Sequence, residues 1–151
     1  MTDFMLLALE EAEKAAARGE VPVGAVLVSP EGTVLAQSGN RTEELADPTA
    51  HAEILVLRKA AAFMHSPRLT GCDLYVTLEP CTMCAAAISF ARIRRLFFGA
   101  YDPKGGGVDH GARFYQQTTC LFRPEVIGGI EETRCGTLLQ RFFQERRNLN
   151  F

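Results

Sequence analysis

The sequence predicts an α/β fold, a three-layer α/β/α sandwich around a mixed five-stranded sheet. Segments rich in β-branched residues alternate along the chain with segments of helical periodicity. Two strands are close enough to form a hairpin, whereas the later strands are joined through helices and are expected to run parallel. Because the 151 residues contain no repeat and no linker, we expect one domain over residues 1–151.

The first part of the chain predicts a helix followed by a hairpin. Residues 3–18 have helical periodicity, with Thr2 or Asp3 as the N-cap, and the helix should end at Gly19. The segment VPVGAVLVSPEGTVLAQSGN, residues 21–40, has β-branched residues on both sides of Ser-Pro-Glu-Gly. Proline at the second position of a turn predicts a hairpin there.

The rest of the chain alternates between the two element types. Asp47-Pro48-Thr49 precedes a run of good helix formers, and Glu79-Pro80 follows a β-branched segment. A glycine-rich turn, KGGGVDHG, separates the later elements. We expect helices at 50–64, 81–91 and 132–147, and strands at 73–78, 94–100 and 125–130.

The composition is that of a globular protein, with 47% hydrophobic and 23% charged residues. No apolar run approaches the roughly 18 residues that a membrane span needs, and acids interrupt the apolar N-terminal stretch, unlike a signal peptide. We therefore expect a cytoplasmic protein without a membrane partner, whose five cysteines are reduced. The net charge of −2 combines an acidic first half with a basic second half, which suits a phosphate-bearing substrate but also an ordinary solvated helix.

A possible metal site involves Cys81 and Cys84, in the stretch LEPCTMCAAA at the start of the predicted helix 81–91. The exposed N–H groups and the dipole of a helix N-terminus favour thiolates. His51 begins another predicted helix, and helix N-termini in an open α/β sheet gather beyond the carboxyl ends of the strands. One imidazole and two thiolates suit tetrahedral zinc with its fourth position open.

Glu53 follows His51 by two residues, in the order HAE. A carboxylate beside an open zinc site can relay protons, and bound zinc lowers the pKa of water to about 7. From the residues alone, two other interpretations stay open. The CxxC pair could be a thioredoxin-like dithiol, or half of a structural zinc site that Cys72 or Cys120 completes.

The HAE motif and the proline before the first cysteine match the H-x-E…P-C-x-x-C signature of zinc nucleobase deaminases. The chain resembles the cytidine/deoxycytidylate deaminase superfamily and, within it, the bacterial tRNA-specific adenosine deaminases. The resemblance extends from the first helix to about Arg147 and rests on EVPVGAVLV, GNR, DPTAHAEI, LYVTLEPCTMCAAAI, FGAYD and FFQERR. The two central motifs indicate a zinc deaminase, and the others favour the adenosine branch.

This resemblance implies a cytidine deaminase-like fold in which His51, Cys81 and Cys84 bind one zinc ion per subunit. It implies that Glu53 is the proton shuttle in the hydrolytic deamination of adenosine to inosine. The implied substrate is the wobble adenosine of a tRNA anticodon stem-loop, since unpaired loop bases enter a pocket at low unstacking cost. It further implies a homodimer with active sites near the subunit interface.

Four residues are candidates for substrate contacts by the same resemblance. Asn40 would contact the flipped nucleotide, although Gly-Asn also ends many strands in turns. Arg41 would meet a phosphate or a base, or be simply exposed. Phe143 would pack against loop nucleotides; because core packing competes with this role, we expect one of Phe142 and Phe143 to face inward and the other outward. Asp102 would contact substrate or cap a turn.

Two other functions remain open. A guanine, cytosine or nucleoside deaminase would use the same zinc chemistry, but it would have no use for the aromatic and basic side chains of the last helix. A non-catalytic RNA-binding module with a structural zinc would have no use for Glu53.

Overall fold

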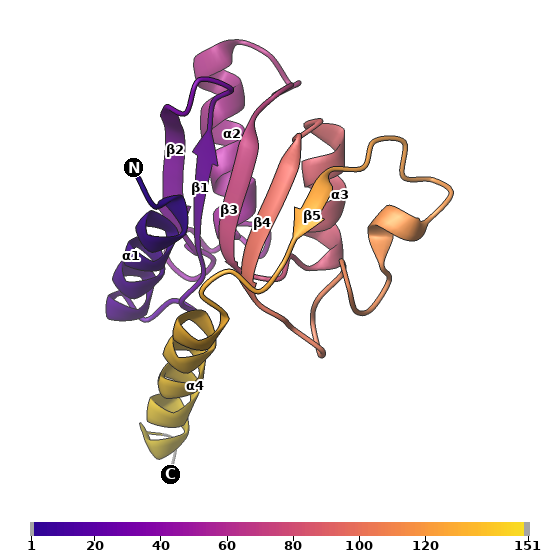
Figure 1. The fold of residues 1–151 in the computed structure, drawn as a ribbon. Helices are drawn as coiled ribbons and strands as arrows, with labels where there is room; N and C mark the ends of the chain where they lie inside the picture. Colours follow the sequence, from indigo (N-terminus) through magenta and orange to yellow (C-terminus); the bar gives the residue numbers. More distant parts are fainter. Residues whose placement is uncertain (1, 150–151) are drawn as a thin grey trace.

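The computed structural model describes residues 2–149, and within them a five-stranded sheet is flanked by four helices (Figure 1). The elements are α1 (Phe4–Ala17), β1 (Gly24–Val28), β2 (Val34–Gly39), α2 (Ala52–Met64), β3 (Asp73–Leu78), α3 (Thr82–Phe90), β4 (Arg95–Ala100), β5 (Glu125–Ile127) and α4 (Glu132–Leu149).

The sheet is mixed, with the strand order β2-β1-β3-β4-β5. β1 pairs antiparallel with both β2 and β3, whereas β3, β4 and β5 run parallel. β2 and β3 therefore point the same way, with β1 between them. The hairpin turn lies where the sequence predicts it, because the Gly32 N–H donates to the Ser29 carbonyl at 3.0 Å.

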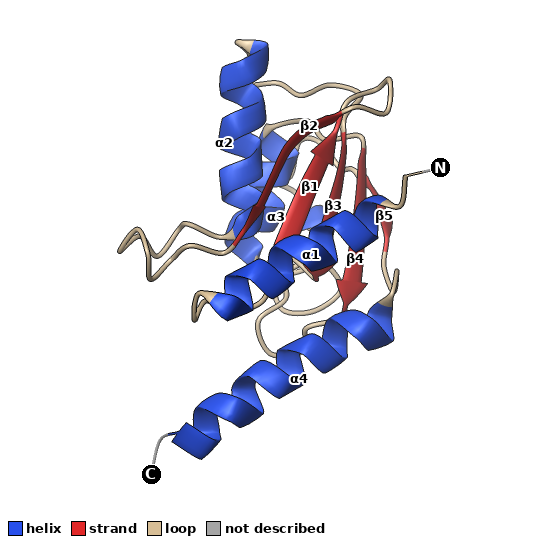
Figure 2. Cartoon of the chain, turned by 90° about the vertical axis from the view of Figure 1, so that its left-hand side faces the viewer, coloured by secondary structure: helices blue, strands red, loops and turns tan. Residues whose placement is uncertain are grey.

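Two helices cover each face of the sheet, so the predicted α/β/α sandwich is confirmed. Figure 2 shows α1 and α4 on one side and α2 and α3 on the other. The side chains of β1 alternate between the two faces: Ala25 and Leu27 pack with α2 and α3, and Val26 and Val28 pack with α1. All four are buried, as is expected of a central strand covered on both sides.

The start of α1 agrees with the sequence prediction, whereas the end of β5 differs from it. The Asp3 carboxylate accepts the N–H groups of Met5 and Leu6 and caps α1. β5 ends earlier than expected, at Ile127 instead of residue 130, because two glycines follow and the chain turns toward α4. The irregular segment before β5 contains one short 3₁₀ turn, Phe114–Gln116.

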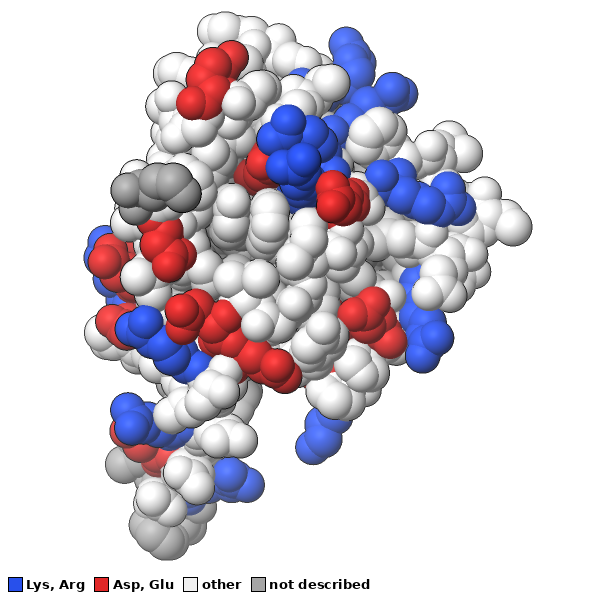
Figure 3. Space-filling model, viewed as in Figure 1, with Lys and Arg blue, Asp and Glu red and all other residues white. Residues whose placement is uncertain are grey.

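Charged side chains are mixed on the face that Figure 3 shows, with a basic group near the upper edge. At the amino end of β4, Arg94 contacts Asp73 at 2.9 Å and Arg95 contacts Glu125 at 3.1 Å. These arginines lie at the end of the sheet opposite to the starts of α2 and α3. None of the helices within residues 2–149 combines the length and the apolar character that a membrane span requires.

Candidate metal centre and active site

The start of α2 leaves the imidazole of His51 free to bind a ligand. Asp47 accepts the N–H and the hydroxyl of Thr49 at 2.9 and 2.7 Å, which bends the chain into the helix. His51 is the N-cap residue, but its side chain makes no capping hydrogen bond. Instead the Ala52 N–H donates to Oδ1 of Asn40 at 2.8 Å, so a residue from the end of β2 performs the capping.

The start of α3 places two thiols beside that imidazole. Cys81 is the N-cap residue of α3 and Cys84 lies in the first turn, where it is fully buried. Nδ1 of His51 lies 3.6 Å from Sγ of Cys81 and 3.5 Å from Sγ of Cys84. The three ligand atoms all lie within 4.8 Å of one another, and the His51 and Cys81 side of the group is partly exposed.

The pKa values of the two thiols are shifted in opposite directions. The hydrogen bond from Cys84, helped by the contact with His51, lowers the pKa of Cys81 to about 4 although burial opposes this. The same hydrogen bond and the burial of Cys84 raise the pKa of that thiol. The hydrogen bond to Cys81 raises the pKa of His51. These contacts favour the thiolate form of Cys81, which is the form that binds metals.

The geometry of this group fits a zinc ion. A tetrahedral zinc with Zn–S bonds of about 2.3 Å and Zn–N bonds of about 2.0 Å holds its nitrogen and sulfur ligands about 3.5 Å apart, and the two N···S distances here are 3.6 and 3.5 Å. Three protein ligands of this mixed type leave one position open, as in catalytic zinc sites.

Glu53 is buried on the first turn of α2, with 4% of its surface exposed. Burial raises the pKa of its carboxyl to about 7, and the nearby Cys81 thiolate adds to the shift. A carboxyl group with this pKa can accept and release a proton near neutral pH. A buried carboxyl group with a shifted pKa close to a set of metal-binding side chains is typical of functional sites.

A comparison with known protein families shows to which family this chain belongs. Residues 1–100 match the model of the cytidine and deoxycytidylate deaminase zinc-binding region. The chain belongs to this family. The predicted family and the predicted zinc cofactor are thereby confirmed, and the group formed by His51, Cys81 and Cys84 is consistent with a zinc site.

The deaminase is similar over nearly its full length to curated bacterial proteins. It is 60% identical to the tRNA-specific adenosine deaminase of Agrobacterium fabrum, over 97% of this chain and 95% of that protein. It is 46% identical to the tRNA-specific adenosine deaminase of Haemophilus influenzae, over 95% of this chain and 83% of the relative.

Solved structures share the fold. One, from a study of A-to-I editing by tRNA:A34 deaminases at the wobble position, is 61% identical with a TM-score of 0.88, and the match covers 90% of this chain and 98% of that one. A guanine deaminase from Bacillus subtilis is 30% identical with a TM-score of 0.63, covering 78% and 87% of the two chains.

The structural-zinc alternative with Cys72 or Cys120 has no geometric support within residues 2–149. There the group of metal-binding side chains consists of His51, Cys81 and Cys84 alone. Both other cysteines are buried, and Sγ of Cys120 lies 3.5 Å from Oγ of Ser89, among protein atoms.

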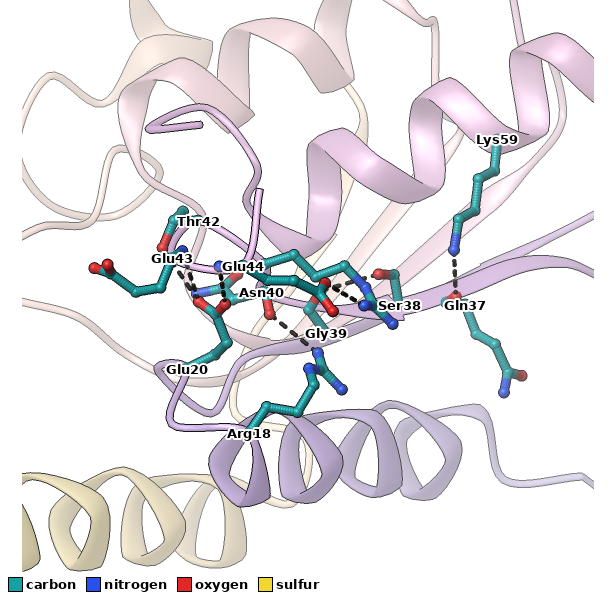
Figure 4. Close-up of polar contacts among 11 residues, drawn as sticks. Arg18, Glu20, Gln37, Ser38, Gly39, Asn40, Thr42, Glu43, Glu44 and Lys59 are labelled. Atoms are coloured by element: carbon teal, nitrogen blue, oxygen red, sulfur yellow. Dashed lines mark hydrogen bonds and ion pairs between the residues drawn. The ribbon is translucent and has the colours of Figure 1, made fainter. Parts of the chain in front are cut away.

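Asn40 lies just after the end of β2, where the chain leads toward the start of α2 (Figure 4), and Arg41 is the next residue. Asn40 is buried and its Oδ1 is occupied by Ala52, while no hydrogen bond of its Nδ2 is found within the described residues. The guanidinium of Arg41 pairs with the carboxylate of Glu44. The capping role of Asn40 is therefore observed directly, and contact with a substrate stays a prediction for both residues.

Asp102 lies two residues after the end of β4 and caps a turn. Its Oδ1 accepts the N–H groups of Lys104 and Gly105 at 3.2 and 3.0 Å. No hydrogen bond to its Oδ2 is found in the part of the chain that the structure describes. The turn-capping role is thus present, and the second carboxylate oxygen is available for another partner.

One of the two aromatic residues of α4 is buried and the other is exposed, as predicted. Phe142 is 7% exposed, whereas Phe143 is 46% exposed. The Arg146 guanidinium lies 4.8 Å above the Phe142 ring and donates to the Gly19 carbonyl at 2.9 Å. These contacts join α4 to the end of α1 and leave Phe143 on the outside.

Sequence reasoning missed Glu20, a buried carboxylate that organises the loop after Asn40. It accepts the N–H groups of Glu43 and Glu44 at 3.1 and 2.8 Å and the Thr42 hydroxyl at 3.3 Å (Figure 4). Burial raises its pKa, but these hydrogen bonds and the Arg18 charge outweigh it and hold the pKa below the ordinary value. The EVPVG stretch offered no local signal, because the partners lie more than 20 residues away.

Sequence reasoning also missed Glu79, immediately before Pro80 in LEPC. Its carboxylate is fully buried and lies 2.8 Å from Nδ1 of His110. The only available signal was an acid between a strand and the CxxC pair. Sequence analysis had not singled it out as a functional residue.

Proposed function

We propose that this deaminase converts adenosine to inosine at the wobble position of a tRNA anticodon loop, releasing ammonia. The observation that carries the proposal is the 61% identity and TM-score of 0.88 to a structure from work on tRNA:A34 deaminases. The 60% identity to the tRNA-specific adenosine deaminase of A. fabrum also supports it. The B. subtilis guanine deaminase is less similar in both sequence and fold.

In this proposal His51, Cys81 and Cys84 bind one zinc ion per subunit. When bound, zinc supplies Lewis-acid chemistry that makes a water molecule nucleophilic at neutral pH. The 3.5 and 3.6 Å distances between imidazole nitrogen and thiol sulfurs suit that role.

Glu53 transfers protons. Its carboxyl is buried on the first turn of α2, two residues after His51. It can take a proton from the attacking water and pass it to the purine ring. It can then take the proton of the new hydroxyl group at C6 and pass it to the amino group, which leaves as ammonia. Water and adenosine thus give inosine and ammonia with no net proton change at the enzyme.

The remaining predicted residues bind the nucleotide. Nδ2 of Asn40 can donate to the base or ribose, and Oδ2 of Asp102 can accept from it. Arg41 would meet a backbone phosphate after leaving Glu44, and the exposed ring of Phe143 would stack on a loop base, an interaction worth about 1–3 kcal/mol.

We further propose that residues 1–151 act as one zinc deaminase domain, as a cytoplasmic homodimer. The large apolar side chains Phe90 and Leu121, which are 76% and 92% exposed, support an interface on the α3 side of the sheet. Analytical ultracentrifugation tests this assembly: a monomer at every concentration would contradict it.

The function is tested with three substrates offered separately to the purified protein: an anticodon stem-loop with adenosine at the wobble position, guanine, and cytidine. We expect inosine from the stem-loop alone, detected by mass spectrometry of the digested RNA. A stem-loop with its adenosine moved into the paired stem is the matched control and should stay unchanged. Ammonia from guanine or cytidine, with an unmodified stem-loop, would instead identify a free-base or nucleoside deaminase.

A further inference from the structure

Glu79 is a buried charged residue that the proposed chemistry does not use. It lies between the end of β3 and Cys81, and its side chain is 0% exposed. Its own N–H donates to the Ala100 carbonyl at 2.8 Å, which aligns the ends of β3 and β4. A buried carboxylate is costly unless hydrogen bonds satisfy it, so the partners of Glu79 are informative.

All side-chain partners of Glu79 come from one loop, residues 102–110, which follows β4. Oε1 accepts the N–H of Asp102 at 3.0 Å and lies 2.8 Å from Nδ1 of His110. Oε2 accepts the N–H groups of Val108, Asp109 and His110 at 3.2, 2.9 and 3.2 Å. A carboxylate has about four lone-pair sites, so this one is saturated by both ends of the 102–110 loop.

Two consecutive glycines bring the 102–110 loop into contact with the segment that carries the cysteines. A Cβ on Gly106 would lie 2.4 Å from Oε2 of Glu79, and a Cβ on Gly107 would lie 2.5 Å from the N atom of Thr82. The Gly107 N–H also donates to the Pro80 carbonyl at 2.8 Å. The loop is thus pressed against the first turn of α3, next to Cys81 and Cys84.

We propose that Glu79 is a positioning residue, whose carboxylate holds the 102–110 loop as a wall of the substrate site and places Asp102 for substrate contact. The proposal rests on the proposed function for the role of Asp102. Glu79 acts on the substrate only through this loop, because its own oxygens are enclosed by the loop's N–H groups.

Glu79→Gln tests the proposal with little change in volume. The amide keeps one acceptor oxygen but turns the other oxygen into an NH₂ group, which faces N–H groups and cannot accept from them. We expect the variant to keep a full equivalent of zinc while its kcat/KM for the stem-loop falls by about tenfold or more, chiefly through KM, since displaced binding groups are costly. Amide exchange at Val108 and Asp109 should become about tenfold faster.

A double-mutant cycle with Asp102→Asn separates positioning from a purely structural role. If Glu79 acts through Asp102, the double variant loses no more kcat/KM than the more impaired single variant. If the two losses multiply, or if Glu79→Gln lowers only the melting temperature while kcat/KM is unchanged, the proposal is overturned. Glu125→Gln, on an exposed carboxylate of β5, is the control and should match the wild type.

Gly106→Ala is the second variant, because its Cβ would collide with the carboxylate of an intact Glu79 and with the Asp102 carbonyl, and so displaces the loop. It should reproduce the KM effect and the non-additivity with Asp102→Asn, and it replaces Glu79→Gln if that variant does not fold.

Loss of folding in both variants would overturn the proposal, because it would make Glu79 a residue of global stability. If the wild type makes no inosine, the proposed function fails. The amide exchange of Val108 and Asp109, compared between the wild type and Glu79→Gln, then still decides whether Glu79 holds the loop.

Discussion

Nδ1 of His51 lies 3.5 Å from Sγ of Cys84, although the two residues are 33 positions apart in the chain. The contact exists because α2 follows β2 and α3 follows β3, and these two strands point the same way on either side of β1. Both helices therefore start at the same edge of the sheet, where ligand sites in α/β folds collect. The following predictions concern the site at this edge and the elements that support it.

Glu53→Gln should keep zinc and lose deamination. The amide has nearly the same shape as the carboxyl but cannot take up and release a proton, so turnover should fall by at least about 10²-fold. Metal analysis and stem-loop turnover on the same sample check this. Near-normal turnover would remove Glu53 from the mechanism.

Cys84→Ala should lose zinc and stability together. Cys84 is fully buried in the ligand group, and binding of a metal to the folded state alone contributes to its stability. Cys72→Ala is the control, since Cys72 is a buried cysteine outside that group, and it should keep its zinc. A full equivalent of zinc in Cys84→Ala would show that the ligand assignment is wrong.

Phe142→Ala and Phe143→Ala should have opposite effects. Phe142 is 7% exposed and Phe143 is 46% exposed. Truncating the buried ring should cost about 3 kcal/mol of unfolding free energy. Truncating the exposed ring should leave the melting temperature within a few degrees of wild type while raising KM for the stem-loop. Equal losses of stability and activity in Phe143→Ala would favour a packing role for that residue.

Glu20 should contribute stability that is lost in acid. Its folded-state pKa is lowered from the ordinary 4.5, so the unfolded chain takes up the proton at a higher pH than the folded one. The contribution is therefore complete above about pH 4.5 and disappears as the pH falls through the folded pKa. The free energy of unfolding, measured by urea denaturation, should fall more steeply below about pH 4.5 in wild type than in Glu20→Gln.

Parallel curves for the two proteins would contradict this. Protonation of zinc ligands contributes equally to both curves, so their difference isolates Glu20.

Local signals predicted most elements of the fold. The Asp3 carboxylate caps α1 by accepting N–H groups that lie two and three residues later in the chain. The Ser29–Gly32 turn is closed by a hydrogen bond between residues that are three positions apart. Such interactions are contained in a short window of sequence. The end of β5 was predicted too late, because β-branched residues alone do not show where the pairing with β4 stops.

The sequence by itself determined the donor types of this deaminase, namely the imidazole and acid of HAE and the paired thiols of PCTMC, together with the alternation of elements that carries them. Only the tertiary structure decided that the imidazole meets both thiols, that Phe142 is inside and Phe143 outside, and that Glu20 and Glu79 hold loops. The physical reason is distance along the chain. Burial and hydrogen bonds of a buried carboxylate depend on N–H groups more than 20 residues away, and no short pattern records which of them will be nearby.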